Sequence, residues 1–548
     1  MAEDTKQNPE PISFETHPSR YKHLNLTLDG SIATLGIDIK EDQGMRPGYV
    51  LKLNSYDLGV DIELCDAVQR LRFEHPEVTA VVVKSEIEGI FSSGANIFML
   101  GSSTHAFKVN FCKYTNETRL SIEDATANSG QTYIAALNGT CSGGGYELAL
   151  ACEEIILVDD RRSAVSLPEV PFLGVLPGTG GLTRVVDKRK IRRDRADIFC
   201  TLAEGFKGKK ALKWGFVDTV APLSRFNDVV AERAKAIAGE GRAERKGVTL
   251  EPLEPSMTED GFEYRHVSLK LDDAARTATL EVRAPTEVQA FPSDGSLPDA
   301  SWYPLRMYRE LDDALVRLRF NHPNIGLVIL HTRGDAQKVL ELDAQLKANQ
   351  DNWFVNEVLL NMRRVFKRLD LSAKSFFALI DEGSCFAGSL LELAFGSDRT
   401  YMLDEDGIEI QLSDLNDGTF PMANGLSRLE TRLLGEPSLF EEVRGNREAM
   451  VASDAEDGGL ITLAYDELDW DDEIRLALEE RAGLSPDALT GMEASLRFAG
   501  PETLETKIFG RLSAWQNWIF QRPNAVGPQG ALTLYGQPES AEFDYRRT

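Results

Sequence analysis

The stretch Asn138-Gly139-Thr140-Cys141-Ser142-Gly143-Gly144-Gly145-Tyr146-Glu147 decides the fold of this chain. A β-type run, residues 132–137, precedes it, and a helical run, residues 148–151, follows it. Three glycines thus lie where a strand turns into a helix, and glycine lets a backbone approach a ligand closely. The first N–H groups of a helix lack an acceptor within the helix and carry the positive end of its dipole. The N–H of Gly144 could therefore hold a developing oxyanion, with Glu147 on the same helix face one turn further on.

A glycine triplet alone fits a tight packing turn equally well, but two further segments accompany it. Phe91-Ser92-Ser93-Gly94-Ala95-Asn96 follows an apolar strand at residues 80–83. Leu167-Pro168-Glu169 leads into the glycine-rich run Leu173-Gly174-Val175-Leu176-Pro177-Gly178-Thr179-Gly180-Gly181. In this order and spacing the three segments resemble the crotonase (enoyl-CoA hydratase/isomerase) superfamily. The resemblance covers residues 20–225.

The resemblance implies an α/β fold, a crotonase-like ββα superhelix, and assigns roles to four residues. The backbone N–H groups of Ala95 and Gly144 would form an oxyanion hole for a thioester carbonyl. Glu147 and Glu169 match the two catalytic glutamates of the hydratase branch. Two carboxyls beside one water can act as acid and base when their pKa values differ. Taken singly, Glu147 could be a helix N-terminal acid and Glu169 a surface acid.

Composition limits the classes of protein to which this chain can belong. Its 548 residues are too many for a single hydrophobic core, so two or three domains are expected. The net charge of −27 argues against nucleic acid as a partner. Six scattered cysteines without CxxC pairs favour reduced thiols in the cytoplasm. Residues 1–18 are too polar for a signal peptide, and no apolar run predicts a membrane span.

The second half of the chain repeats the first. Tyr21-Lys22-His23-Leu24 recurs as Tyr264-Arg265-His266-Val267, residues 63–76 recur as 310–323, and Gly181-Leu182-Thr183-Arg184 recurs as Gly425-Leu426-Ser427-Arg428. The offset in residue number between matching blocks is nearly the same for all three, which predicts two tandem copies of one fold. We expect an N-terminal arm (1–19), a catalytic crotonase-like domain (20–238), a linker (239–255), a degenerate crotonase-like domain (256–475) and a C-terminal helical segment (476–548).

The second copy lacks the residues that the chemistry needs. Its counterpart of the glycine turn, residues 385–392, reads as one residue longer and keeps one glycine. Glu392 roughly matches Glu147, and Asp414 stands where Glu169 would be. Nothing like the segment 91–96 occurs near residues 339–346. This copy is expected to be structural, a built-in subunit partner, although a regulatory CoA site is the alternative.

Further candidate residues come from the same loops. Cys112 lies in a segment that covers the acyl pocket in crotonase relatives, so its thiol is a candidate catalytic group or a small buried hydrophobe. Lys52 and Arg46 are candidates for the CoA phosphates, against the simpler interpretation as solvated surface bases. Gly143 and Asn96 complete the expected CoA-binding set. No metal-ligand spacing is present, so no metal site is predicted.

The doubled architecture, the run 91–100 and the tail Trp515-Gln516-Asn517-Trp518-Ile519-Phe520-Gln521-Arg522-Pro523 are similar to the ring-opening lyases of this superfamily. That resemblance covers the full chain. It implies aerobic benzoyl-CoA degradation by the "box" pathway, with 2,3-epoxybenzoyl-CoA and two waters giving 3,4-didehydroadipyl-CoA semialdehyde and formate. It implies no cofactor beyond the CoA of the substrate. The alternatives are an enoyl-CoA hydratase or isomerase on another bulky acyl-CoA, and a non-catalytic acyl-CoA-binding protein. A homodimer is expected, because the chain carries its own second module.

Overall fold

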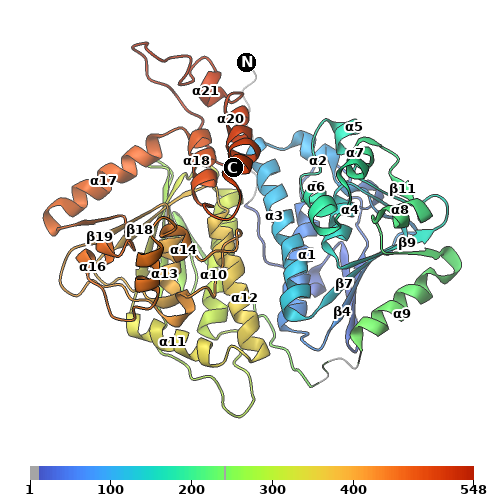
Figure 1. Cartoon of the computed structure of the whole chain (residues 1–548), viewed down its shortest axis with the longest axis horizontal. Helices are drawn as coiled ribbons and strands as arrows, with labels where there is room; N and C mark the ends of the chain where they lie inside the picture. Colours follow the sequence, from blue (N-terminus) through green and yellow to red (C-terminus); the bar gives the residue numbers. More distant parts are fainter. Residues whose placement is uncertain (1–10, 240–241, 243) are drawn as a thin grey trace. The chain divides into compact units, whose positions relative to one another are not determined.

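The structure is a computed structural model that describes residues 11–239, 242 and 244–548. Residues 1–10 of the expected arm and residues 240, 241 and 243 of the expected linker lie outside the described part. The chain divides into an N-terminal unit, Phe14–Leu250, and a C-terminal unit made of Glu251–Thr548 with residues 11–13. The division falls inside the expected linker, 239–255. Figure 1 shows the elements of each unit.

A six-stranded sheet forms the core of the N-terminal unit, in the order β1-β2-β4-β7-β9-β12. Its strands are β1 (Leu24–Asp29), β2 (Ile32–Ile37), β4 (Ala80–Ser85), β7 (Thr132–Leu137), β9 (Glu154–Asp159) and β12 (Thr219–Pro222). Only β1 and β2 pair in antiparallel fashion, as a hairpin in which Leu24 faces Ile37. The other pairs are parallel, so helices must connect them.

A second, smaller sheet carries the motif segments. Its strands are β5 (Gly89–Ser92), β8 (Gly139–Ser142), β10 (Ala164–Ser166) and β11 (Phe206–Lys207), and a separate two-stranded ladder pairs β3 (Ser55–Tyr56) with β6 (Gly94–Ala95). Each strand of the large sheet from β4 to β9 is followed by a strand of the small sheet and then by a helix. This repeat is the expected ββα superhelix.

Helices cover both faces of the large sheet. They are α1 (Leu58–Phe73), α2 (Ile97–Ser102), α3 (His105–Asp124), α4 (Gly144–Ala151), α5 (Glu169–Leu173), α6 (Gly181–Thr183), α7 (Arg193–Thr201), α8 (Gly208–Trp214) and α9 (Phe226–Ala238). On one face, α9 packs Phe226 and Val230 against Ile134 of β7. The apolar spacing predicts α1 only from Ile62; the helix begins at Leu58 because the Asp57 carboxylate accepts from the N–H groups of its first turn.

An eight-stranded sheet forms the core of the C-terminal unit, in sequential order from β13 to β20. Its strands are β13 (Ser256–Thr258), β14 (Gly261–Glu263), β15 (Val267–Asp272), β16 (Thr277–Arg283), β17 (Leu327–Arg333), β18 (Ser375–Ile380), β19 (Arg399–Leu403) and β20 (Leu463–Tyr465). The first four strands form antiparallel pairs, and the strands from β16 to β20 are parallel. The order from β15 to β19 repeats that from β1 to β9.

The helices of this unit include a long C-terminal set. They are α10 (Tyr303–Asn321), α11 (Ala336–Ala348), α12 (Trp353–Asp370), α13 (Gly388–Phe395), α14 (Arg428–Arg432), α15 (Pro437–Arg444), α16 (Ala452–Asp457), α17 (Glu467–Gly483), α18 (Pro486–Leu496), α19 (Leu504–Lys507), α20 (Ser513–Ile519) and α21 (Pro523–Val526). Ile474 of α17 packs on the sheet beside Phe377 and Tyr401. The tryptophan-bearing α20 lies against α18 of its own unit, with Trp515 and Ile519 near Gly491.

The two copies keep the same internal contacts. The Tyr21 hydroxyl donates to Asp66 of α1 at 2.5 Å, and the Tyr264 hydroxyl donates to Asp313 of α10 at 2.6 Å. These pairs fix the first hairpin of each copy to its first helix. The repeat seen in the sequence is therefore also a repeat of three-dimensional structure.

A second shared contact lies at the other end of each copy. An arginine after the glycine-rich loop binds a carboxylate of the long helix: Arg184 contacts Glu123 of α3 at 2.9 Å, and Arg428 contacts Asp370 of α12 at 2.6 Å. Both arginines are buried. The two contacts differ in one respect. The second copy has Asp370 in place of Glu123, and aspartate is one methylene shorter than glutamate.

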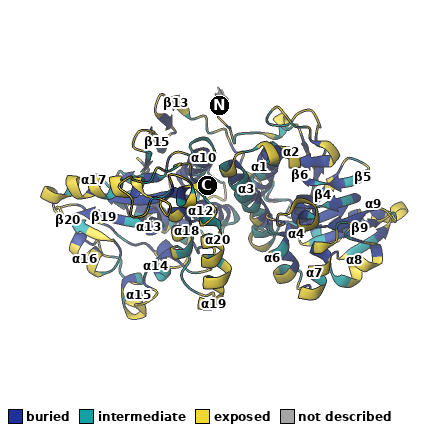
Figure 2. Cartoon of the chain, turned by 90° about the horizontal axis from the view of Figure 1, so that it is seen from above, coloured by how far each residue is buried: buried dark blue, intermediate teal, exposed yellow. Residues whose placement is uncertain are grey.

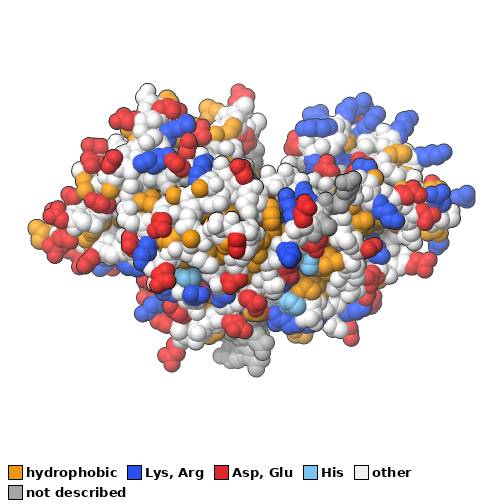
Figure 3. All heavy atoms as spheres, turned by 90° about the horizontal axis from the view of Figure 1, so that it is seen from below, with side chains coloured by type: hydrophobic (Ala, Val, Ile, Leu, Met, Phe, Trp, Pro, Cys, Tyr) orange, Lys and Arg blue, Asp and Glu red, His pale blue; other side chains and the backbone are white. Residues whose placement is uncertain are grey.

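The surface is polar around these buried cores. Figure 2 shows the strands as buried and helices such as α15, α17 and α19 as mostly exposed. Acidic and basic side chains are interspersed on the face drawn in Figure 3. Within the described part, no helix combines the length and apolar character needed to cross a bilayer.

Candidate active site

Each glycine of the triplet allows a close approach that a side chain would block. Gly143 adopts φ 54° and ψ −132°, a backbone conformation open mainly to glycine. A Cβ would lie 2.9 Å from Glu169 Oε1 at Gly143, 2.1 Å from the Tyr56 hydroxyl at Gly144 and 2.7 Å from the Ser92 carbonyl oxygen at Gly145. The turn is thus packed against three other segments of the unit.

The loop 91–96 meets this turn at Gly94. A Cβ there would lie 2.6 Å from the Gly144 amide nitrogen, and φ is +88°. In the β3–β6 ladder the Asn96 N–H donates to the Tyr56 carbonyl at 2.8 Å. Amides alternate in direction along a strand, so the N–H of Ala95 points away from β3. Gly144 opens α4 and has no acceptor within it. The loop 91–96 and the start of α4 therefore meet at Gly94 and Gly144.

Glu147 is buried and fully hydrogen-bonded. Its Oε1 accepts from the N–H of Thr179 at 3.0 Å and from that of Gly181 at 2.8 Å. The Thr179 hydroxyl donates to Oε2. An ionised carboxylate is an acceptor only, so three donors suit it well. Glu147 thus ties α4 to the glycine-rich loop. Thr179 was not among the residues predicted for the site, although its loop was.

Glu169 has the opposite environment. It is the first residue of α5 and only 9% exposed, and its Oε2 has no hydrogen-bond partner among the described residues. Burial, with the nearby charge of Glu147 as the next cause, raises the pKa of Glu169 to about 7. A carboxyl with such a pKa can both give up and take up a proton near neutral pH, as acid–base catalysis requires.

Tyr56 is a site residue that the sequence analysis missed. Its hydroxyl is buried beside Gly144 and has no hydrogen-bond partner among the described residues. Burial raises the pKa of this phenol. Its ring lies 6.0 Å from that of Phe111 and under the guanidinium of Arg119, which binds Asp61 at 2.8 Å. A lone tyrosine after Asn54-Ser55 carries no pattern from which this position could have been predicted.

Cys112 lies on α3 close to Glu147. Burial raises the pKa of its thiol to about 11, with the charge of Glu147 as the next cause. A thiol with such a pKa is protonated at neutral pH and is a poor nucleophile. The structure therefore brings Cys112 to the site, while a direct role for it stays a prediction.

The residues expected to bind CoA differ in whether their side chains already contact other groups of the protein. The Asn96 side chain is used by the protein: it donates to the carbonyl of Val50 (2.8 Å) and the hydroxyl of Ser55 (3.0 Å) and accepts from the N–H of Met99 (2.9 Å). It therefore caps α2 and holds the loop 91–96. Arg46 stacks over the Phe107 ring at 4.6 Å, and Lys52 is exposed. Their binding roles stay predictions.

Comparison with known proteins shows the family of this chain. A benzoyl-CoA-dihydrodiol lyase from Aromatoleum evansii is 56% identical over 544 residues, which are 98% of each chain. The family model of enoyl-CoA hydratase/isomerase matches residues 51–272. This chain belongs to the crotonase (enoyl-CoA hydratase/isomerase) family.

Solved crotonase structures resemble about two-fifths of the chain. An enoyl-CoA hydratase of Geobacillus kaustophilus is 34% identical, with 40% of this chain and 75% of that chain covered and a TM-score of 0.35. The human mitochondrial delta3-delta2-enoyl-CoA isomerase is 22% identical, with 40% and 78% covered and a TM-score of 0.34.

In the second crotonase copy, the amide that corresponds to that of Gly144 already donates to another group of the protein. Gly388 matches Gly143, and its φ is +49°. The N–H of Gly388 donates to the carbonyl oxygen of Gln411 at 2.8 Å, just as the N–H of Gly143 donates to the carbonyl oxygen of Ser166 at 2.9 Å. The next amide, that of Ser389, donates to the Asp343 carboxylate at 2.6 Å. Asp343 belongs to α11, which stands where the first copy has the loop 91–96. A carboxylate of the protein thus fills the place of a ligand oxygen.

The register at this turn locates the expected extra residue of the second copy. From Gly388 to Glu392 the second copy has the same length as Gly143 to Glu147, so the extra residue lies before Gly388. Glu392 is hydrogen-bonded to Asn416 at 2.8 Å and to Arg428 at 3.1 Å. Asp414 is exposed and is paired with Arg447. The expectation that this copy lacks a working site fits these contacts.

Proposed function

We propose that this chain is a ring-opening lyase that converts 2,3-epoxybenzoyl-CoA and two waters to 3,4-didehydroadipyl-CoA semialdehyde and formate. The observation that carries the proposal is the 56% identity to a benzoyl-CoA-dihydrodiol lyase over both crotonase copies and the C-terminal segment. Two waters balance the atoms and electrons of this reaction, so the proposal needs no redox cofactor or metal. Coenzyme A enters only as part of the substrate.

In the proposed mechanism, the thioester carbonyl oxygen lies between the N–H groups of Ala95 and Gly144. Two preorganised donors stabilise negative charge on this oxygen, and one such donor is commonly worth about 3 kcal/mol in the transition state. The thioester then draws electron density from the attached ring and makes the ring carbons electrophilic. The support for this oxyanion hole is the contact of the two loops at Gly94.

The glutamates divide the proton transfers in this proposal. Glu169 has an unpartnered carboxyl oxygen and a pKa raised to about 7, so it can exchange a proton with an attacking water at neutral pH. Glu147, with three donors on its carboxylate, holds its loop and the second water. Cleavage of the ring C–C bond then releases one carbon as formate.

Mass spectrometry of the products from synthetic 2,3-epoxybenzoyl-CoA tests the proposal. We expect a CoA thioester of a six-carbon semialdehyde and one formate per turnover. Glu147→Gln and Glu169→Gln should each slow formate release by at least a hundredfold, since acid–base groups contribute that much. The exposed neighbour Glu153→Gln is the matched control. Formate release near the wild-type rate from both site variants would remove the glutamates from the mechanism.

A second candidate is hydration or isomerisation of another bulky enoyl-CoA. The glutamate pair and the 34% identity to an enoyl-CoA hydratase favour it. Crotonyl-CoA and epoxybenzoyl-CoA assayed side by side separate the two activities. A non-catalytic acyl-CoA-binding protein would turn over neither substrate.

We further propose a cytoplasmic homodimer. The six cysteines are all free in the structure, which suits a reducing compartment. Large apolar side chains around α5 are exposed, among them Phe172 at 69% and Leu176 at 65%. Such a patch commonly marks an interaction surface. Light scattering on the purified chain measures the oligomeric state, and a monomer at micromolar concentration would exclude the dimer.

A further inference from the structure

An unassigned pocket of about 230 Å³ opens in the C-terminal unit, between α14, α17 and α18. Four arginines and three carboxylates line it, together with apolar side chains. Two of the arginines are neutralised by close carboxylates: Arg428 contacts Asp370 at 2.6 Å, and Arg497 contacts Asp398 at 2.7 Å. The remaining two arginines, Arg432 and Arg481, decide what the pocket can bind.

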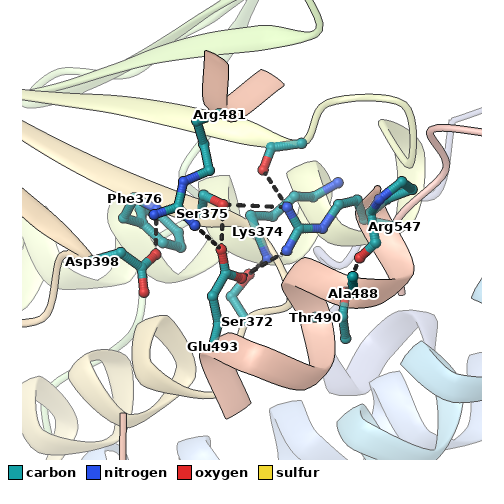
Figure 4. Close-up of polar contacts among 12 residues, drawn as sticks. Ser372, Lys374, Ser375, Phe376, Asp398, Arg481, Ala488, Thr490, Glu493 and Arg547 are labelled. Atoms are coloured by element: carbon teal, nitrogen blue, oxygen red, sulfur yellow. Dashed lines mark hydrogen bonds and ion pairs between the residues drawn. The ribbon is translucent and has the colours of Figure 1, made fainter. Parts of the chain in front are cut away.

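Arg481 shares one carboxylate with two other arginines. Glu493 lies 3.2 Å from Arg481 and 2.7 Å from Arg547 (Figure 4). It also lies 3.6 Å from Arg497. Burial lowers the pKa of both Arg481 and Arg547, while the charges of Glu493 and Asp398 oppose this shift. The Arg481 side chain is 7% exposed, and its Nε has no hydrogen-bond partner among the described residues. Arg481 thus lines the pocket and shares its one close carboxylate with two other arginines.

Arg432 has no carboxylate partner among the described residues. Its Nε donates to the Gly459 carbonyl at 2.5 Å, and burial alone lowers its pKa to about 10. The corresponding residue of the first copy, Lys188, lies 3.1 Å from Glu123. In the second copy the corresponding carboxylate is Asp370, whose side chain is shorter than that of Glu123 and which is paired with Arg428. The neighbouring Thr431 hydroxyl is also buried, with no hydrogen-bond partner in the described part of the chain.

Most of the remaining wall is apolar. Besides Gly396 and Ser397, it consists of Phe395, Met422, Met492, Leu496 and Ala499. A cluster with surplus positive charge beside apolar side chains suits an anion that carries a short hydrocarbon body. The volume lies below the range usual for drug-sized ligands, so the anion must be small. We propose that this pocket binds a small monocarboxylate through Arg432, Arg481 and Thr431. This site is separate from the proposed thioester site and does not depend on it.

Isothermal titration of the full chain with butyrate and with benzoate tests the proposal, with inorganic phosphate as comparator at fixed ionic strength. We expect one carboxylate per chain on the wild type. Arg432→Gln should weaken this binding at least tenfold, because a charge-assisted hydrogen bond is lost. Arg475→Gln, an exposed arginine on the same helix as Arg481, is the matched control and should bind as the wild type does.

Thr431→Val provides a second variant in case Arg432→Gln folds poorly, and it should weaken binding as well. Three results would overturn the proposal. They are no heat with either carboxylate, tighter binding of phosphate than of both carboxylates, and carboxylate binding that is unchanged in both Thr431→Val and Arg432→Gln.

Discussion

The carboxyl of Glu169 links catalysis to pH and stability. Its pKa is about 7 in the folded chain and about 4.5 when exposed. Between these values the folded protein holds a proton that the unfolded chain has lost. The protonated Glu169 carboxyl therefore makes its full stabilising contribution to the free energy of unfolding below pH 4.5. This contribution falls as the pH rises to 7, by at most about 1.4 kcal/mol per pH unit.

Glu169→Gln should remove this part of the pH dependence. Thermal midpoints of the wild type and the variant, measured at pH 5.5 and pH 7.5, give the comparison. The variant should lose less stability than the wild type over this interval, because glutamine has no proton to lose. Parallel changes in both proteins would show that Glu169 has an ordinary pKa in the folded chain.

The hydroxyl of Tyr56 gives a second prediction at the scale of one residue. It is buried beside Gly144 and has no hydrogen-bond partner among the residues that the structure describes, so its burial costs folding free energy. Tyr56→Phe should leave the thermal midpoint unchanged or higher, yet lower kcat/KM if substrate supplies the missing hydrogen bond. A lower midpoint with full activity would show instead that the hydroxyl has a structural partner.

At the scale of elements, the central contact is that between the loop 91–96 and the start of α4. Gly94→Ala would place a Cβ 2.6 Å from the Gly144 amide nitrogen, in a backbone conformation with φ +88°. The loops would have to separate, and we expect activity to fall at least a hundredfold. Gly101→Ala, within α2 and with open space around it, is the control and should keep full activity. Full activity in Gly94→Ala would show that the two loops need not touch.

Local elements were predictable where local patterns determine them. The strand Thr132–Leu137 and a helix over residues 148–151 occur as expected, because such patterns act over a few residues. The strand β8 within the expected turn was not predicted, and α4 already begins at Gly144. The start of α1 was placed four residues late, since a capping Asp57 has no apolar period. Contacts across the fold could not be derived: nothing in a single sequence shows that Asp343 reaches Ser389, or that the Tyr56 hydroxyl lies against Gly144.

At the scale of the whole molecule, we expect the duplication to have left one thioester site per chain. The first copy presents the Gly144 amide, and the second covers the matching Ser389 amide with Asp343. Titration with benzoyl-CoA should therefore give one site per chain. Asp343→Ala should not add a second, because α11 offers no equivalent of the Ala95 amide. Two sites per chain in the wild type would contradict this account.

The central claim is that the amides of Ala95 and Gly144 together hold the thioester oxygen. A crystal structure of the chain with benzoyl-CoA, which lacks the epoxide and cannot open, tests it most directly. The account predicts the carbonyl oxygen at about 3 Å from both amide nitrogens, with the ring toward Glu147, Glu169 and Tyr56. A carbonyl oxygen held by other groups, or a thioester bound in the C-terminal unit, would contradict it.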